Sequence, residues 1–473
     1  MEKISVFDIL KIGIGPSSSH TVGPWRAGAR FLKYFQETYQ LEEIVSLSVE
    51  FFGSLAKTGH GHGTDIAVVM GLSGAEVSQF DVSKLDETIQ SIRDLGSLSL
   101  LARHEIAFDM QECLKFNKNE PRSTHPNTME FSVILKDGTV IKEAWYSIGG
   151  GFIKRGLGDE LDAEDLKAEI PFPVQTAEDL LHWHHSEDKN IAEISLQNEQ
   201  NWRPLVEIRQ SLQDIWTVMK ESVFVGCHSD GILPGGLNVV RRAARINRDL
   251  LHGQSYKNID EWLSLLKKQK RDMDTVTAWV SCFALAVNEV NASFGRIVTA
   301  PTNGSAGVVP AVLMYLYCFH DDFTQADIDN FLLVTGEIGS LFKKGATISA
   351  AAGGCQAEIG VSSAMAAAAL TQSLGGNTSQ SIMAAEIAME HHLGLTCDPV
   401  GGLVQIPCIE RNSMGAMKAI TAAQLALHSD PAQARVSLDD VVKTMWRTAQ
   451  DMKSQYKETS EGGLAIQVGL AEC

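Results

Sequence analysis

The chain has 473 residues, which is too long for one ordinary core, so we expect two or three domains. Its formal net charge of −18 disfavours phosphate-rich partners such as nucleic acids and anionic membrane surfaces. The amino-terminal segment has no basic stretch followed by a long apolar run, and later apolar stretches are broken well before the ~20 residues that span a bilayer. We therefore expect a cytoplasmic protein without a membrane partner, whose eight cysteines are reduced thiols or metal ligands.

Residues 1–155 are predicted to form an α+β domain. Pro24 opens a helix that runs to Gln36, and a β-branched and aromatic run predicts a strand over residues 44–52. A short helix is expected over residues 64–71, with Asp65 in its first turn. Residues 129–135 and 139–148 flank a turn with an Asp-Gly pair, which predicts a hairpin.

The remaining chain is predicted to be a linker followed by a larger all-α domain. Residues 156–200 are acidic and poor in β-branched apolar residues, which indicates a solvated linker with one short helix. Residues 201–473 show no strand pattern and are rich in alanine, which permits close helix–helix contact. Helices are expected over residues 275–292, 306–318, 326–343, 356–373, 379–392 and 412–428.

The eight cysteines fall into groups by their surroundings. Cys282 and Cys318 lie inside apolar helical runs and are expected to be core residues, and Cys113 and Cys227 have no partners at ligand spacing. Cys355, Cys397 and Cys408 instead lie in irregular, Gly- or Pro-bearing sequence at helix edges, where backbone N–H groups can lower a thiol pKa. Their spacing has no Cys-x-x-Cys pair and is unlike a zinc finger. From spacing alone, three buried thiols and three metal ligands are both open.

Chemistry suggests what three such thiolates can do. They can hold an iron–sulfur cubane by three of its irons and leave the last iron with an open coordination position. Such an iron is a Lewis acid that can bind a hydroxyl and a carboxylate. Four cysteine ligands would close the cluster and suit it to electron transfer.

The motifs along the chain carry a resemblance that runs from end to end. The chain resembles the bacterial, single-chain, iron–sulfur-dependent L-serine dehydratases. The motifs that carry this resemblance are Gly15-Pro16-Ser17-Ser18-Ser19-His20-Thr21, the run from Gly61 to Asp65, Thr124-His125-Pro126-Asn127, Gly235-Gly236-Leu237-Asn238, Thr299-Ala300-Pro301-Thr302-Asn303-Gly304, Cys355, and the two runs Cys397-Asp398-Pro399-Val400 and Pro407-Cys408-Ile409-Glu410-Arg411-Asn412.

This resemblance implies an L-serine ammonia-lyase that converts L-serine to pyruvate and ammonia. It implies a [4Fe–4S] cluster held by Cys355, Cys397 and Cys408 in the helical domain, and no pyridoxal phosphate. A homodimer is expected from the apolar content.

Elimination from serine also needs a base for the Cα proton, and histidine is suited because its pKa lies near working pH. His20 and His62 lie in Gly/Ser-rich loops that let the backbone approach a small ligand. We expect His62 to be the base, with His20 as the alternative base or as the proton donor. Ser18, Ser19, Thr302, Asn303 and Gly304 are candidate contacts for the substrate carboxylate and amino group.

The last residue, Cys473, ends a segment that begins with Gly462-Gly463. It is either a frayed terminal thiol or a ligand that fills the open iron until serine displaces it. We adopt the second hypothesis.

Three other functions are compatible with parts of the sequence. A hydro-lyase for another hydroxy acid could use the same open iron. A pyridoxal-phosphate dehydratase could use Lys343 or Lys344 as its Schiff-base lysine. In a non-enzymatic redox or metal sensor, the cysteines would report oxygen and the first domain would bind an amino acid, although no basic helix-turn-helix-like segment supports a transcriptional role.

Overall fold

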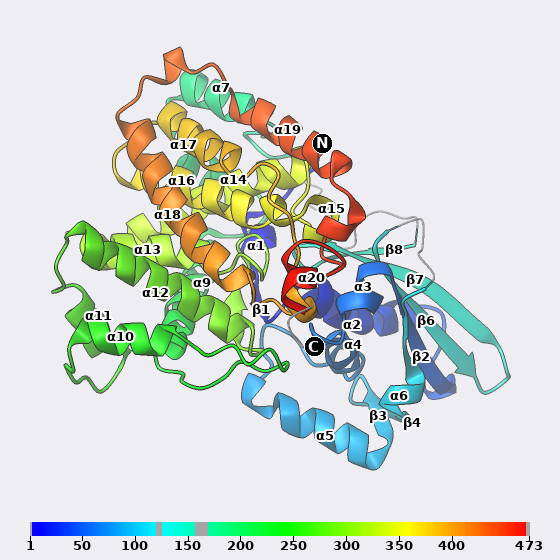
Figure 1. The fold of residues 1–473 in the computed structure, drawn as a ribbon. Coiled ribbons are helices and arrows are strands. Elements are labelled where there is room, and N and C mark those ends of the chain that lie inside the picture. The colour runs from blue at the N-terminus through cyan, green and yellow to red at the C-terminus, as the bar shows by residue number, and fades with distance from the viewer. Residues whose placement is uncertain (1, 120–124, 157–168, 470–473) are drawn as a thin grey trace.

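A computed structural model describes residues 2–119, 125–156 and 169–469 (Figure 1). Cys473, Thr124 and the acidic run at residues 159–165 lie outside the described residues. A sheet domain lies on one side of the molecule and a larger helical domain on the other, as Figure 1 shows. The predicted fold class, α+β followed by a mainly helical domain, is confirmed.

The first domain is built on a five-stranded sheet. Its strand order is β5 (Leu114–Asn117), β2 (Ile44–Phe52), β6 (Asn127–Leu135), β7 (Val140–Gly149) and β8 (Phe152–Arg155). The predicted strand and hairpin are both present, and β6 pairs with β7 so that Thr128 lies opposite Tyr146. Only β2 and β5 run parallel within this sheet. Smaller elements at its edge are α5 (Leu85–Leu95), β3 (Ser97–Leu100), β4 (His104–Ala107) and α6 (Met110–Cys113).

Two helices cover one face of this sheet and hold the loops that matter below. They are α2 (Gly23–Phe35) and α4 (Thr64–Leu72), close to the predicted bounds. They cross tightly because a Cβ on Gly71 would lie 1.9 Å from the carbonyl oxygen of Trp25, a distance no larger residue tolerates. Phe31, Phe131 and Trp145 fill the core beneath them.

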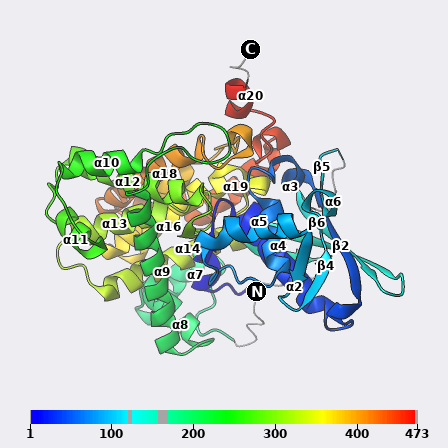
Figure 2. The ribbon, with the colours of Figure 1, turned by 90° about the horizontal axis from the view of Figure 1, so that it is seen from below.

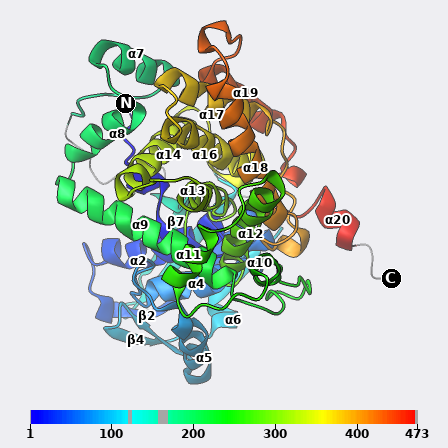
Figure 3. The same cartoon turned by 90° about the vertical axis from the view of Figure 1, so that its left-hand side faces the viewer.

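The helical domain is arranged around α16 (Ile359–Ser373), whose alanines are fully buried. Small side chains let α13, α14, α17 and α18 approach it from several sides, which explains its alanine-rich sequence (Figure 3). The six predicted helices are present with small shifts at their ends. The elements of this domain are α9 (Leu205–Gly226), α10 (Ala243–Leu251), α11 (Ile259–Leu266), α12 (Met273–Asn291), α13 (Val308–Phe319), α14 (Gln325–Gly345), α15 (Ala350–Gly353), α16, α17 (Thr378–Glu390), α18 (Cys408–Leu427), α19 (Leu438–Asp451) and α20 (Leu464–Gly469).

The stretch expected to be a linker contributes to the helical core. Its described part forms two helices, α7 (Ala177–Glu187) and α8 (Ile191–Gln200), where one short helix was expected. Leu180, Ile191 and Ile194 are fully buried in the helical core. The acidic composition of the stretch gave no sign of these buried positions.

The two domains exchange short segments. Helix α1 (Val6–Ile9) packs against α14, and Ile4, Val6, Ile9 and Leu10 are part of the helical core. Strand β1 (Ile12–Ile14) pairs antiparallel with β9 (Arg296–Val298), which corrects the expectation of no strand after residue 201. Both strands are three residues long, too short for a strand pattern to be visible in the sequence.

Across the described ranges, no helix combines the length and apolar character required to cross a membrane.

Candidate active site

Three thiols converge where the helical domain faces the sheet domain. Cys355 begins a 3-10 turn directly after α15, and Cys408 is the first residue of α18. Cys397 is held in a loop by the tail, since its N–H donates to the Tyr456 carbonyl at 2.8 Å and its own carbonyl accepts from Glu458 N–H at 2.9 Å. Ligand atoms of Cys355, Glu358 and Cys397 lie within 4.8 Å of one another, which is a geometry that can hold a metal.

The electrostatics of this cluster favour bound cations. The neighbouring Cys355 thiol and burial raise the pKa of Cys397, and burial with the same neighbour raises that of Cys408. The closeness of the thiols therefore disfavours their thiolate forms in the absence of a metal. A bound metal ion would stabilise the thiolates, because it places positive charge beside them.

Arg411 supplies the one partly compensating charge among the described contacts of these thiols. Burial alone would lower its pKa, but Cys355, Cys408 and Asp398 raise it above the ordinary value. Its guanidinium donates to Asp398 at 3.0 Å and to the Thr396 carbonyl at 2.6 Å, which ties α18 to the loop that carries Cys397.

His62 has one nitrogen engaged and one free. Its Nδ1 lies 3.0 Å from the carbonyl oxygen of Thr58, which accepts only, so Nδ1 must carry the proton. Its buried Nε2 has no hydrogen-bond partner among the described residues. Burial lowers the pKa of His62 to about 4, so the ring is neutral at pH 7 and Nε2 presents a lone pair.

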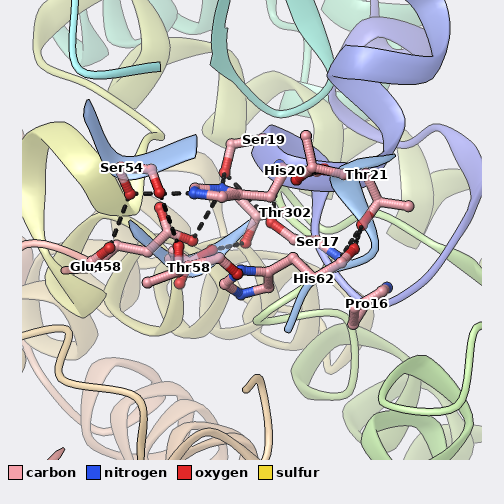
Figure 4. Close-up of polar contacts among 12 residues, drawn as sticks. Pro16, Ser17, Ser19, His20, Thr21, Ser54, Thr58, His62, Thr302 and Glu458 are labelled. Atoms are coloured by element: carbon pink, nitrogen blue, oxygen red, sulfur yellow. Dashed lines mark hydrogen bonds and ion pairs between the residues drawn. The ribbon is translucent and has the colours of Figure 1, made fainter. Parts of the chain in front are cut away.

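His20 lies beside His62, with ring centroids 4.5 Å apart, and is held on both sides (Figure 4). Ser19 Oγ lies 2.9 Å from its Nδ1, and Ser54 Oγ lies 3.1 Å from its Nε2. Ser54 donates its proton to the Glu458 carbonyl at 2.8 Å, so Nε2 of His20 is the donor to Ser54. Burial and the neighbouring His62 lower the pKa of His20 well below its ordinary value.

Two glutamates that the sequence reasoning missed join the histidines to the thiols. Glu358 accepts from Thr302 Oγ1 at 2.6 Å and lies 3.9 Å from Cys355 Sγ. Glu458 Oε1 lies 3.6 Å from His20 Nδ1. Burial raises the pKa of both, and the charge of Glu358 raises that of Glu458 further. Glu358 follows Cys355 by three residues, which is a usable signal, whereas Glu458 belongs to no motif.

The predicted substrate contacts have different surroundings. Ser18 and Ser19 are buried in the turn η1 (Ser18–Val22), beside His20. A Cβ on Gly304 would lie 2.9 Å from the Glu358 carboxylate, so glycine here permits close approach to the site. Asn303 donates to the Ile14 carbonyl and to Asn291, which joins the two domains, while its Oδ1 has no partner among the described residues.

The other described cysteines lie away from this group. Cys282 and Cys318 are buried in the helical core as expected. Cys227, expected to be isolated, lies 3.7 Å from Cys282 through their Sγ atoms. Neither the sequence spacing nor the helix pattern indicated this contact, because the two residues lie on α12 and at the end of α9.

Comparison with known proteins relates both domains of the chain to serine dehydratases. Residues 5–156 match the family described as serine dehydratase beta chain, and residues 186–465 match the one described as serine dehydratase alpha chain. An L-serine dehydratase of Streptomyces coelicolor is 45% identical over 99% of this chain and 100% of its own length. The chain belongs to the serine dehydratase family.

Other relatives agree with this assignment. L-serine dehydratase 2 of Escherichia coli is 43% identical over 98% of this chain and 99% of its own, and an L-serine dehydratase of Helicobacter pylori is 42% identical over the same shares. In this family member, the segments matched by the beta-chain and alpha-chain families supply the histidines and the thiols, respectively.

Proposed function

We propose that the protein eliminates water from L-serine, giving pyruvate and ammonia, and that it uses a [4Fe–4S] cluster. The observation that carries this proposal is the meeting of three buried thiols with two buried, neutral histidines at the domain junction. Its support also includes family membership and the L-serine dehydratases that are similar over nearly the whole chain.

The donor set suits such a cluster. Cys355, Cys397 and Cys408 would hold three irons, and Arg411 would offset part of the thiolate charge. When bound, the cluster supplies one Lewis-acidic iron with an open position for the substrate hydroxyl. Buried thiols with a raised pKa also fit this role better than that of a free nucleophile.

The protein's own groups would handle the protons. We assign His62 as the base, because its Nε2 lone pair is free while its Nδ1–H is fixed by Thr58. His20 holds Nε2–H toward Ser54 and is the alternative. Glu458, with its raised pKa, can hold a proton beside His20 for the leaving hydroxyl. Loss of water gives the enamine of pyruvate, which tautomerises and hydrolyses to pyruvate and ammonia.

Thr302 and Gly304 border Glu358, so they would shape the wall nearest the thiols, whereas Ser18 and Ser19 would contact the substrate from the sheet domain. Asn303 would act mainly by fixing Ile14 and Asn291. Lys343 and Lys344 have other contacts: Lys343 pairs with Glu2 at 2.6 Å, and Lys344 donates to the Val174 carbonyl at 2.9 Å. Their positions therefore give no support to a pyridoxal-phosphate enzyme.

We retain the hypothesis that the tail thiol of Cys473 fills the open iron until serine displaces it. The described tail passes the site, since Glu458 belongs to it, and α20 projects from the body of the molecule (Figures 2 and 3). Leu464 and Val468, one helical turn apart on α20, are 43% and 45% exposed, which leaves apolar side chains available for docking. Cys473→Ala should change the affinity for serine or the lifetime of the cluster in air. Equal values in both proteins would remove the hypothesis.

The deciding experiment is anaerobic purification, analysis of iron and sulfide, and detection of pyruvate from L-serine. We expect iron, sulfide and turnover in the wild type and loss of turnover in Cys355→Ala, with Cys318→Ala as the matched control for a buried core thiol. Serine, threonine and malate assayed side by side would identify another hydro-lyase, and iron without turnover would favour a sensor. Cytoplasmic location and a homodimer remain predictions.

A further inference from the structure

Three polar side chains at the domain junction are buried and unsatisfied. Asn127, Ser147 and Ser349 are at most 1% exposed. Within the described part of the chain, both polar atoms of the Asn127 amide and both hydroxyls have no hydrogen-bond partner. A buried polar group without a hydrogen-bond partner destabilises the fold, and a fold accepts such a cost where a ligand meets the group instead.

The first two of these side chains lie on adjacent strands, β6 and β7. Thr128 opposite Tyr146 is the last pair of the register between them, and Asn127 and Ser147 are the residues next to that pair on the two strands. Side chains alternate between the faces of a strand, so Asn127 shares the face of Met129, and Ser147 shares the face of Trp145. Both point to the side of the sheet that α2 and its preceding turn cover.

This side of the sheet faces the turn that carries His20. A Cβ on Gly23 would lie 2.1 Å from Ser147 Oγ and 3.4 Å from the Ser18 carbonyl, so the Ser147 hydroxyl touches the turn that carries His20. Asn127 forms a backbone bridge with Gly53, and the next residue, Ser54, contacts His20.

Ser349 approaches from the other domain. A Cβ on Gly149 would lie 2.8 Å from Ser349 Cβ, so Ser349 rests on the end of β7, two residues beyond Ser147. Ser349 precedes α15, which leads directly to Cys355. The three unmet side chains therefore border the region between the histidine turn and the first thiol.

We propose that Asn127 and Ser147, with Ser349, bind the α-ammonium and α-carboxylate groups of the substrate and select 2-amino acids over 2-hydroxy acids. This inference rests on the proposed elimination from L-serine. The Asn127 NH₂ group and the serine hydroxyls can donate to a carboxylate, and Asn127 Oδ1 can accept from an ammonium group. A 2-hydroxy acid offers Oδ1 a neutral hydroxyl donor in place of a charged ammonium donor, and the resulting hydrogen bond is weaker.

The test uses the anaerobically prepared holoenzyme and the variants Asn127→Leu and Ser147→Ala. Leucine has a shape close to that of asparagine and no polar atom. We expect each variant to raise the KM for L-serine at least tenfold, with iron, sulfide and visible absorbance as in the wild type. We also expect the thermal midpoint without serine to be unchanged or higher, because an unmet polar group has been removed.

Two further measurements separate this role from a structural one. Serine should raise the thermal midpoint of the wild type and have little effect on Asn127→Leu. Ser195→Ala is the matched control, because Ser195 is a buried serine on α8 whose hydroxyl also has no partner within the described part of the chain. It should leave the KM unchanged.

The outcomes are distinguishable. If the wild-type holoenzyme makes no pyruvate, the proposed function fails. If it does so and both variants keep the wild-type KM, the groups meet only water and this inference alone is overturned. A lower thermal midpoint or lost iron in Asn127→Leu, with a wild-type KM in Ser147→Ala, assigns a purely structural role and also overturns it.

Discussion

The Thr58 carbonyl decides which nitrogen of His62 can act. Because a carbonyl oxygen only accepts, it fixes the proton on Nδ1 at 3.0 Å and leaves Nε2 as the acceptor. The same contact, a ring Nδ1 beside the carbonyl four residues earlier, holds His392 at Ala388 at 2.7 Å, five residues before Cys397 in the chain. His62 and His392 thus share the same tautomer and are both buried. The surroundings of the Nε2 atom distinguish the two rings.

This difference predicts the effect of replacing His62. His62→Asn should lower kcat by about 10²–10⁴-fold, the usual contribution of a positioned base, with iron content unchanged. His392→Asn removes a ring with the same backbone contact and a pKa that burial also lowers to about 4, and it should keep the wild-type kcat. A similar loss in both variants would indicate that burial of a ring, and not its position, is what matters.

The pH dependence follows from the same burial. The pKa of His62 is lowered from 6.5 to about 4, so the free base persists as pH falls and is lost only near pH 4. We therefore expect kcat/KM to show no loss with a midpoint near 6.5 and to fall only at lower pH. Initial rates after a brief pH jump measure this before acid unfolds the protein. A midpoint near 6.5 would mean that His62 is solvated, or that another histidine is the base.

The first turn of α18 combines a thiol with its compensating charge. Cys408 begins the helix, and Arg411 lies one turn later, where it donates to Asp398. The Cys355 and Cys408 thiols, with Asp398, raise the pKa of Arg411. The adjacent Glu410 instead pairs outward with Arg242 at 2.7 Å, and both are exposed. One helical turn therefore carries a buried charge that serves the cluster and an exposed one that does not.

Arg411→Met should weaken metal retention about 10–100-fold, the usual effect of losing a group that supports metal ligands. The measurement is the fraction of iron lost to a chelator under anaerobic conditions. Arg242→Met is the control and should retain iron like the wild type, since surface ion pairs contribute little. Equal loss in the two variants would show that Arg411 does not support the thiols.

Helices α1 and α8 are joined by a buried carboxylate. Glu199 accepts from Val6 N–H at 2.7 Å and from Ser5 Oγ at 2.9 Å. Burial raises its pKa to about 7, so stability that is present below pH 4.5 is lost as pH rises through 7. Relative to the wild type, Glu199→Gln should gain up to about 3 kcal/mol in free energy of unfolding between pH 4.5 and 8. Urea unfolding at both pH values measures this, and a constant difference would contradict it.

At the scale of elements, long patterns were predictable and short ones were not. The bounds of β2 were predicted to the residue, and α12, α13, α14, α16, α17 and α18 were located in a helical region without a strand pattern. Strands β1 and β9 are three residues each and exist only because they pair with one another. Helices α7 and α8 were underestimated because their acidic faces outweigh their apolar ones in composition.

For the molecule as a whole, motif residues could be named from sequence, whereas their partners depend on how the domains meet. His20, His62 and Cys355 stand in recognisable motifs. Glu458 reaches His20 from 438 residues further along the chain, and Asn127 is distinguished only by having unmet groups in a buried place. Neither property is visible before the chain is folded.

Removing the metal should affect the whole molecule, because three separate segments would each lose an anchor. The thermal midpoint of chelated protein should be lower than that of the holoenzyme, by roughly 2–4 °C for each kcal/mol lost. Differential scanning calorimetry in the absence of oxygen measures this, with Cys355→Ala as the control that should respond little to chelation. Equal midpoints would mean that metal does not bind the folded thiols.

Helix α1 and strand β1 anchor the amino-terminal end of the chain in the helical domain. Residues 4–10 enter the helical core, and β1 then pairs with β9, before the chain builds the sheet domain. The sheet domain is thus attached to the helical one by an embedded leading segment as well as by the peptide chain that follows β8. A gene split after the sheet domain would yield two polypeptides that still interlock through that leading segment. One catalytic centre could therefore be inherited as either one subunit or two, with little change to the residues that compose it.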